Sequence, residues 1–461
     1  MENNKRQSTS LFDIDGKPSF KKSFPIALQH LLAMLIGNAL PSILLTNTLA
    51  GTEFAVSPDQ AIYVIQAGMF IAAIATFLQL YPVLKVGAKL PVVMGVSFAY
   101  IPVLLAIGKQ YGYEAVYGAQ LVGGIVAFLC GLSIKKIRKY FPPIVSGTVV
   151  LTIGLSLYPV AIGYMAGGNG NPLYGTSYQW IVAFIILATV LVCNMFGKGL
   201  VKLASILIGI IVGYIVSLIM NATVVPGFID FANVNSAGWF TLPEILPFKP
   251  KFPTDAVITT AIMYVVNSIQ AIGDISSTTV GGMDRDATDE EISGAIKCNG
   301  ISSIIGALIG ALPTATYSQN VGIVSMTKVT ARKVISITAT MILIAGFIPK
   351  FGGLLMSIPQ AVIGGATISV FAQITMNGIK LISQQELSMR NSTIVGLGLA
   401  LGMGITSVPE ATALMNPKLA MIFTSSPVII ATLAVFILNI VLPDKTLEQE
   451  AREREEIDKE K

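Results

Sequence analysis

Four polar side chains share one face of a long apolar segment, residues 255–281. Asn267, Gln270, Asp274 and Thr278 fall within about 80° of one another on a helix, and the opposite face is apolar. An ionised aspartate at the centre of a membrane helix costs roughly 2.5–3.5 kcal/mol. These groups must therefore face a substrate, a water-filled cavity or another helix. Hydrogen bonds that only lock helices together are the alternative to a substrate site.

A second polar cluster occurs in the sequence LPTATYSQNVGIVSMTKV, residues 312–329. Its polar residues are nearly consecutive, so they cannot all lie on one helical face: Thr314, Thr316, Tyr317, Ser318, Gln319 and Asn320. The pattern predicts an extended piece that leads into a half-helix beginning at Gly322, because non-helical backbone at membrane depth is tolerated only where it lines a cavity. The Gln319 amide offers one acceptor and two donors to a flat heterocycle, and the start of a half-helix adds free N–H groups.

A third group of candidates lies in residues 95–100 and in the first apolar run. Residues 95–100 include Ser97, Phe98 and Ala99, a mixture similar to that of the second cluster. The Phe98 ring is able to stack on an aromatic ligand, although phenylalanine in a membrane helix usually serves packing. His30 is the only histidine of the chain. An ionisable residue within a membrane segment favours a functional role over packing.

The composition places all these residues in a membrane. Of 461 residues, 53% are hydrophobic and 12% are charged, whereas soluble proteins carry about 25% charged residues. The deficit extends over the whole chain, which predicts an all-α polytopic membrane protein within a lipid bilayer. Three cysteines lie in apolar runs without metal-ligand spacing, so we expect no disulfide framework, metal or cofactor. We also expect no catalytic residues, and the net charge of +5 follows from short basic loops and not from nucleic-acid binding.

About fourteen apolar runs approach the roughly 20 residues that a spanning helix needs. They lie at 25–47, 60–83, 90–108, 116–134, 143–166, 177–196, 200–220, 255–281, 291–311, 314–329, 331–349, 354–375, 392–407 and 422–442. Lys and Arg gather in the loops of one side, among them Lys135–Lys139, Lys380 and Arg390. This asymmetry predicts a multi-pass protein of the plasma (inner) membrane with both termini in the cytoplasm. No signal peptide is expected.

The polar gap at residues 221–253 divides the runs into two sets of seven. Because seven is odd, two halves of the same fold would have inverted topologies. Weak internal similarity supports such a repeat, since segments 3 and 10 open with Leu-Pro and segments 5 and 12 each carry Pro and then Gly. Broken segments at matching positions of two inverted halves are typical of a transporter site near the membrane midplane. We therefore predict a 7+7 inverted repeat with short extended pieces in segments 3 and 10.

The second cluster carries a family resemblance. Residues 319–328, QNVGIVSMTK, match the pattern [Q/E/P]-N-x-G-x-x-x-x-T-[R/K/G] of the nucleobase–ascorbate transporter family. The stretches QH in segment 1, SFAY in segment 3, AIGD in segment 8 and IPQAVIGGA in segment 12 also resemble that family. The likeness extends over about residues 20–440 and is specific in combination.

The resemblance implies a core domain that carries the substrate and a gate domain that dimerises. In this chain it divides residues into a cytoplasmic tail (1–22), core (23–134 and 254–350), gate (135–253 with the following loop, and 351–442) and a charged cytoplasmic tail (443–461). Members import uracil, xanthine, uric acid or ascorbate, usually in bacteria with protons, by an elevator-like movement. The glutamine at the first position of the pattern resembles the purine branch, so a purine nucleobase, xanthine or uric acid, is expected.

The same resemblance implies the site residues and their roles. Gln270 and Gln319 would bind the base edge, and Phe98 would stack on it. Residues expected to assist, directly or through their backbone, are Ser97, Ala99, Tyr317, Ser318 and Asn320. Asp274 would organise the core, His30 would link helices, and Asn299, Asn267 and Thr278 would complete the polar set.

Two positions depart from the family pattern. Segment 8 of the family usually reads E-x-x-G-D, but here Gln270 replaces the glutamate, and in segment 9 Asn299 stands where the purine branch has aspartate. Asp274 and His30 remain the titrating candidates for cation coupling. An uncoupled nucleobase facilitator, a uracil-type permease and an anion exchanger of the same architecture stay as alternatives. The acidic loop at residues 284–291 is expected to be a solvated turn.

Overall fold

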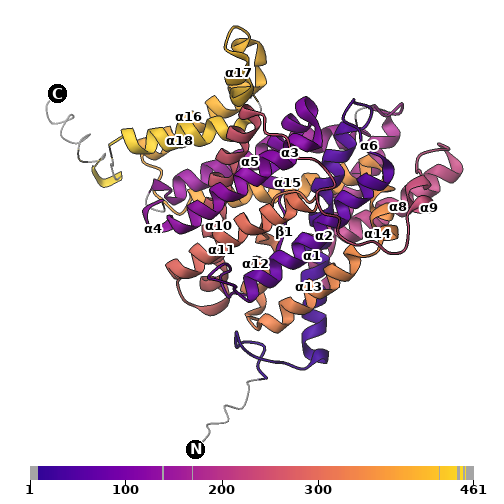
Figure 1. The fold of residues 1–461 in the computed structure, drawn as a ribbon, viewed down its shortest axis with the longest axis horizontal. Helices are drawn as coiled ribbons and strands as arrows, with labels where there is room; N and C mark the ends of the chain where they lie inside the picture. Colours follow the sequence, from indigo (N-terminus) through magenta and orange to yellow (C-terminus); the bar gives the residue numbers. More distant parts are fainter. Residues whose placement is uncertain are drawn as a thin grey trace, which may run out of the picture.

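The computed structural model describes residues 9–137, 140–168, 170–424, 426–443, 447–449 and 452. The expected terminal tails and the basic run 135–139 lie partly outside these residues. Within the described part the chain is mainly helical, in agreement with the predicted all-α class (Figure 1). The N-terminal end of α1 and the C-terminal end of α18 project from different sides of the helical body.

The first half of the chain forms α1 to α9. The long elements are α1 (Phe20–Leu49), α2 (Pro58–Leu80), α3 (Ile101–Leu132), α5 (Pro143–Met165), α6 (Ser177–Phe196) and α8 (Ser205–Thr223). Short elements connect them: β1 (Met94–Val96), η1 (Phe98–Tyr100), α4 (Ile134–Ile137), α7 (Leu200–Leu203) and α9 (Ala232–Ser236). The predicted third and fourth crossings join in α3, which breaks at Gly112, where φ is 76°. Glycine adopts this left-handed backbone without steric cost.

The second half begins with α10 (Thr254–Met283) and α11 (Asp289–Leu308). It continues with β2 (Thr314–Thr316), α12 (Ser318–Thr327), α13 (Arg332–Gly346), α14 (Pro349–Met356), α15 (Gln360–Ile382), α16 (Met389–Ser407), η3 (Pro409–Thr412), α17 (Pro417–Thr424) and α18 (Pro427–Val441). In the described residues, eight helices are long and apolar enough to cross a membrane, or nine if the bent pair α13–α14 counts as one span. The chain is thus a multi-pass helical membrane protein, and the total of fourteen segments stays a prediction.

The two predicted extended pieces are present and pair with each other. β1 and β2 form an antiparallel ladder in which Met94 lies opposite Thr316 and Val96 opposite Thr314. Gly95 is required at the centre of β1, because a Cβ atom there would lie 2.6 Å from the Tyr317 ring. The pairing satisfies backbone groups that would otherwise be exposed at membrane depth. It also brings two segments from opposite halves of the chain to one place.

The predicted start of the half-helix was wrong. We expected it at Gly322, but α12 begins at Ser318, directly after β2. The backbone N–H groups of Asn320 and Val321 both donate to the Tyr317 carbonyl, so the first helical turn closes four residues earlier than the glycine suggested. Gly322 lies inside the helix. The free N–H groups of the helix start therefore belong to the residues around Ser318 and Gln319.

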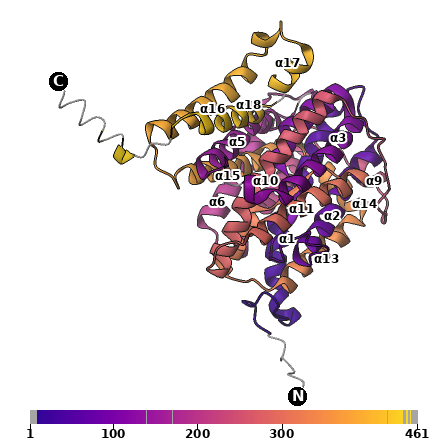
Figure 2. The same ribbon diagram turned by 60° about the vertical axis from the view of Figure 1, so that its left-hand side comes forward.

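The long helices pack in two groups. α1, α2, α3, α10, α11, α12 and α13 contact one another, and α5, α6, α8, α15, α16 and α18 form the second set. In both ribbon views α16 and α18 lie side by side on α5 at one edge, away from α1, α2 and α13 (Figures 1 and 2). Fewer contacts join the groups, among them those of α10 with α5. The candidate site lies where the two groups meet.

Candidate substrate-binding site

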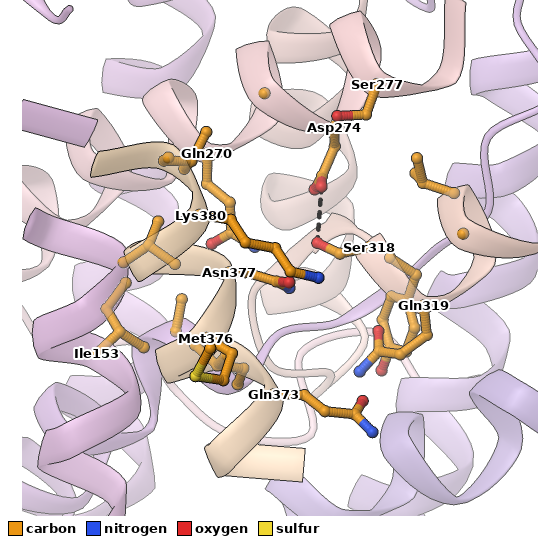
Figure 3. A pocket seen from close by; sticks show the side chains of 18 of the residues that line it. Ile153, Gln270, Asp274, Ser277, Ser318, Gln319, Gln373, Met376, Asn377 and Lys380 are labelled. Carbon is orange, nitrogen blue, oxygen red and sulfur yellow. Dashed lines mark hydrogen bonds between the residues drawn. The ribbon is translucent and has the colours of Figure 1, made fainter. Parts of the chain in front are cut away.

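A cavity of about 1110 Å³ opens between the two helix groups. One wall comes from α10, η1, β2 and the start of α12, and the other from α5, α6 and α15. Of the residues predicted for the site, those that line the cavity are Ser97, Phe98, Ala99, Gln270, Asp274, Tyr317, Ser318 and Gln319. Segments far apart in sequence thus converge on one polar surface (Figure 3).

The Asp274 side chain links α10 to the end of β2 and the start of α12. The Ser318 hydroxyl donates to one carboxylate oxygen at 2.7 Å, and the Thr316 hydroxyl donates to the other at 2.5 Å. Asp274 is 8% exposed. Hydrogen bonds to a charged group contribute more than neutral ones, and a buried carboxylate without them would be costly. These two bonds therefore explain how the aspartate is tolerated inside an apolar segment.

Gln270 and Gln319 present two half-buried amides to the cavity. They lie on either side of the Asp274–Ser318 hydrogen bond in Figure 3. No side-chain hydrogen bond ties either amide to another described residue, unlike most buried polar groups of this chain. Each amide is thus available to donate to and accept from a ligand.

Phe98 and Ser97 form the turn that follows β1. The Ser97 hydroxyl accepts a hydrogen bond from the Ala99 backbone N–H at 3.2 Å, which caps η1. The Phe98 ring is largely buried and meets the Phe371 ring of α15 edge to face, with centroids 5.4 Å apart. Phe98 therefore lies both on the cavity wall and on a contact between the two helix groups. Edge-to-face geometry leaves a ring face that is able to stack on a flat ligand.

Tyr317 lines the cavity but its hydroxyl points elsewhere. The hydroxyl donates to the Val96 carbonyl at 2.7 Å, and the side chain is 5% exposed. The ring packs over Gly37 and Gly95. The Tyr317 side chain thus links the segment before α12 to β1.

His30 and Asn320 form a buried pair outside the cavity lining. The Asn320 amide Nδ2 donates to the His30 carbonyl at 3.0 Å and lies 3.1 Å from His30 Nδ1. This arrangement links α1 to α12, as expected for a helix-to-helix role of His30. It does not match the expected contact of Asn320 with substrate, because the asparagine side chain is turned toward α1.

The polar face of α10 divides into two parts. Gln270 and Asp274 face the cavity, whereas Asn267 accepts a hydrogen bond from the Asn299 amide at 3.3 Å within the helical body. The Thr278 hydroxyl donates to the Asp274 backbone carbonyl at 2.8 Å, so its hydrogen-bond partner lies within α10. Asn267, Asn299 and Thr278 therefore serve helix packing, which was the alternative considered for the whole stripe.

One wall of the cavity was not predicted. Three polar residues of α15 line it opposite α10 and α12: Gln373, Asn377 and Lys380. Their spacing of four and three residues places them on one helical face, and Gln384 lines the cavity from the turn after the helix. That periodicity was visible in the sequence. We had assigned Lys380 only to a basic loop, because the predicted twelfth segment ended at residue 375, whereas α15 continues to Ile382.

Comparison with known proteins agrees with this architecture. A family model described as Permease family (Xan_ur_permease) matches residues 21–411. The chain is 31% identical to the xanthine permease of Bacillus subtilis over 446 residues, which cover 94% of this chain and 97% of the relative. It is 33% identical to the uric acid permease PucJ of the same organism, with 92% and 93% covered. The chain belongs to this permease family, the nucleobase–ascorbate transporters, as the Q-N-x-G pattern indicated; it is a transporter and not an enzyme.

Solved structures of similar fold come from more distant transporters. The transmembrane domain of the cyanobacterial bicarbonate transporter BicA superposes with a TM-score of 0.56 at 15% identity, over 92% of this chain and 98% of that domain. Murine Slc26a9, an anion transporter in an inward-facing state, gives a TM-score of 0.60 at 11% identity, over 91% and 68% of the two chains. At these identities the likeness establishes the fold alone.

Proposed function

We propose that this permease imports an oxidised purine, xanthine or uric acid, through the cavity between the two helix groups. The observation that carries the proposal is the pair of unengaged amides, Gln270 and Gln319, on one cavity with the Phe98 ring. An oxopurine is flat and carries alternating N–H and C=O groups along its edge. Amide side chains match such an edge, and an aromatic ring matches its face. The relatives named for xanthine and uric acid support the same substrate class.

We call the group of α1, α2, α3, α10, α11, α12 and α13 the core group, and the group of α5, α6, α8, α15, α16 and α18 the gate group. Movement of the core group against the gate group would carry the substrate across the membrane. The separate packing of the two groups supports this elevator mechanism, because each can move as a body while few contacts between them change. We assign residues 23–134 and 254–350 to the core and residues 135–253 and 351–442 to the gate, and the packing of the long helices supports this division. Dimerisation through the gate is part of the proposal, with α16 and α18 at its outer edge.

The cavity mouth would face the cytoplasm. Its lining includes Lys380 and Ser325, near the C-terminal ends of α15 and α12, and Gln384, in the turn after α15. Basic residues favour the cytoplasmic side of a membrane. This orientation agrees with cytoplasmic termini and makes the present conformation inward-facing.

Proton symport would depend on Asp274. Both of its oxygens accept hydrogen bonds from hydroxyls of the β2–α12 segment, an arrangement suited to the ionised carboxylate. Protonation would require one of these hydroxyls to turn, so proton binding would change the contact between α10 and α12. Gln270 has no titratable group, which makes an uncoupled facilitator the alternative.

Uptake by cells that express the chain tests the proposal. Labelled xanthine should accumulate above its external concentration, unlabelled uric acid should compete, and a protonophore should collapse the gradient. Equilibration without accumulation would replace symport by facilitated diffusion. Competition by uracil but not by xanthine or uric acid would overturn the purine assignment.

A further inference from the structure

The polar face of α15 gives the gate group its own part of the cavity. Gln373, Asn377 and Lys380 lie within about 60° of one another around the helix axis, and all three line the cavity. Figure 3 shows the Lys380 side chain extending into the cavity beside Asn377. A helix that only packed against its neighbours would have no need of three polar groups at this spacing.

Lys380 is one of two charged residues among the described residues that line the cavity, the other being Asp274. The two charged groups differ in their hydrogen-bond and ion-pair partners. Both Asp274 oxygens accept hydrogen bonds from Thr316 and Ser318. Lys380 is exposed, and no carboxylate of the described residues lies within ion-pair distance of its ammonium group.

The remaining polar groups near the two glutamines are neutral. Gln270 places an amide where the family pattern has a glutamate, so the side chain contributes no negative charge to the cavity. A substrate between α10 and α15 therefore meets neutral amides, a carboxylate whose oxygens are occupied, and an unpaired ammonium group. Such a cavity favours an anion, because an ammonium group without an ion-pair partner attracts an opposite charge.

We propose that Lys380 is a specificity-determining residue that favours anionic over neutral bases. This inference rests on the proposed function and assigns to it a substrate class, the monoanion of an oxidised purine such as uric acid at neutral pH. The gate group would thus select by charge, while the core group selects by hydrogen bonding. A basic residue that serves only membrane topology is the competing interpretation.

Competition against labelled xanthine distinguishes these interpretations. Uric acid, a monoanion at neutral pH, and hypoxanthine, which is neutral, would be compared as inhibitors of the wild type, Lys380→Gln and Lys380→Arg. We expect the inhibition constant for uric acid to rise about three- to tenfold in Lys380→Gln, in the range of one exposed or partly desolvated charge contact. The constant for hypoxanthine should stay within about twofold, and Lys380→Arg should retain the preference for uric acid.

Lys202→Gln is the matched control, because this exposed lysine of α7 lies outside the cavity lining. It should leave both inhibition constants unchanged, with protein abundance measured for each variant. Equal changes for both inhibitors in Lys380→Gln, or no change for either, would overturn the charge selection while leaving purine transport intact. A wild type that transports no purine would overturn the proposed function itself.

Discussion

Asp274 shows how a single buried carboxylate organises the site. It binds Thr316 and Ser318 of the β2–α12 segment from α10, and each of these groups also borders the cavity. The charge that seemed costly in an apolar helix is thus matched by two hydroxyl donors. Its function at the residue scale is to fix the position of the segment that carries Gln319.

Replacement of Asp274 should therefore abolish uptake without removing the protein from the membrane. Asp274→Ala deletes both hydrogen bonds, each worth about 1.5–3 kcal/mol because the acceptor is charged, and we expect uptake to fall at least about tenfold. Initial rates of labelled xanthine uptake, normalised to surface abundance, measure the effect. Ser318→Ala, which removes one bond only, should cause a smaller loss. Uptake of Asp274→Ala with normal rate and affinity would exclude this role.

Gln319 is expected to choose between purine and pyrimidine-like ligands. Gln319→Glu changes a group that both donates and accepts into one that only accepts when ionised. The preference should shift toward uracil-like ligands, with weaker binding of xanthine by about tenfold, the loss expected for one hydrogen bond to a charged group. Competition profiles of a panel of bases report the shift. An unchanged profile would count against the assignment of Gln319 to the base edge.

The sequence predicted the residues of the core wall better than those of the gate wall. Gln270, Asp274 and Gln319 stood out because polar groups are rare in apolar segments. Asn320 was equally conspicuous, yet its side chain binds His30, since only the tertiary structure decides which way a residue near a helix start points. Lys380 looked like an ordinary loop lysine because α15 extends further than the apolar run indicates.

At the scale of elements, the N-terminal segment before α1 forms hydrogen bonds with the loop between α12 and α13. The Leu11 carbonyl accepts hydrogen bonds from the N–H groups of Thr330 and Ala331, and the Ile14 carbonyl accepts one from Arg332. An ion pair joins Arg332 to Asp15. This connection directly follows the Q-N-x-G helix, so the segment supports the element that carries Gln319.

Attachment of this segment should depend on pH. The Arg332 guanidinium hydrogen-bonds Asp15 and lowers the pKa of that carboxyl below its ordinary value of 3.8. A lowered pKa stabilises the attached form above pH about 4 and this contribution is lost as the pH falls through the lowered value. Protection of the Thr330 and Ala331 amides from hydrogen exchange, relative to the intrinsic exchange rate at each pH, should be higher at pH 7 than at pH 3. Asp15→Asn should remove most of the pH dependence; an unchanged pH profile in that variant would refute the role of the ion pair.

The element boundaries were predicted less well than the elements. The extended pieces in segments 3 and 10 followed from their small and polar residues, and the β1–β2 pairing confirms them. The expected start of α12 at Gly322 rested on the nearly consecutive polar residues up to Asn320, which indicated extended backbone as far as that residue. In the structure Tyr317 closes the first turn, a contact that depends on β1 and is therefore invisible in a local pattern.

At the scale of the whole molecule, few hydrogen bonds between described residues join the two helix groups. One links the Tyr164 hydroxyl of α5 to the Leu44 carbonyl of α1 at 3.2 Å, near the C-terminal ends of both helices. In the proposed elevator mechanism, this bond lies on the extracytoplasmic side of the protein, where the inward-facing conformation is closed. Opening toward the outside would break it.

Tyr164→Phe should therefore favour the outward-facing state. Loss of one hydrogen bond of about 0.5–1.5 kcal/mol corresponds to a shift of about two- to tenfold in the conformational equilibrium. A cysteine introduced at Ser325, in the cavity lining at the proposed cytoplasmic mouth, should react correspondingly more slowly with a membrane-impermeant thiol reagent applied from the cytoplasmic side. Tyr214→Phe, which loses a hydrogen bond to Ser357 away from the cavity lining, is the control. Equal labelling rates in wild type and Tyr164→Phe would argue against a role of the Tyr164–Leu44 hydrogen bond in stabilising the inward-facing state.

A purine site between the two helix groups can be tested by equilibrium binding of labelled xanthine to the purified protein. We expect saturable binding that uric acid displaces, and an affinity at least about tenfold weaker in Gln319→Ala, because a hydrogen-bonding amide of the cavity is removed. Lys202→Gln should bind as the wild type does. Absence of saturable purine binding, or equal affinity in wild type and Gln319→Ala, would contradict a purine site between the two helix groups.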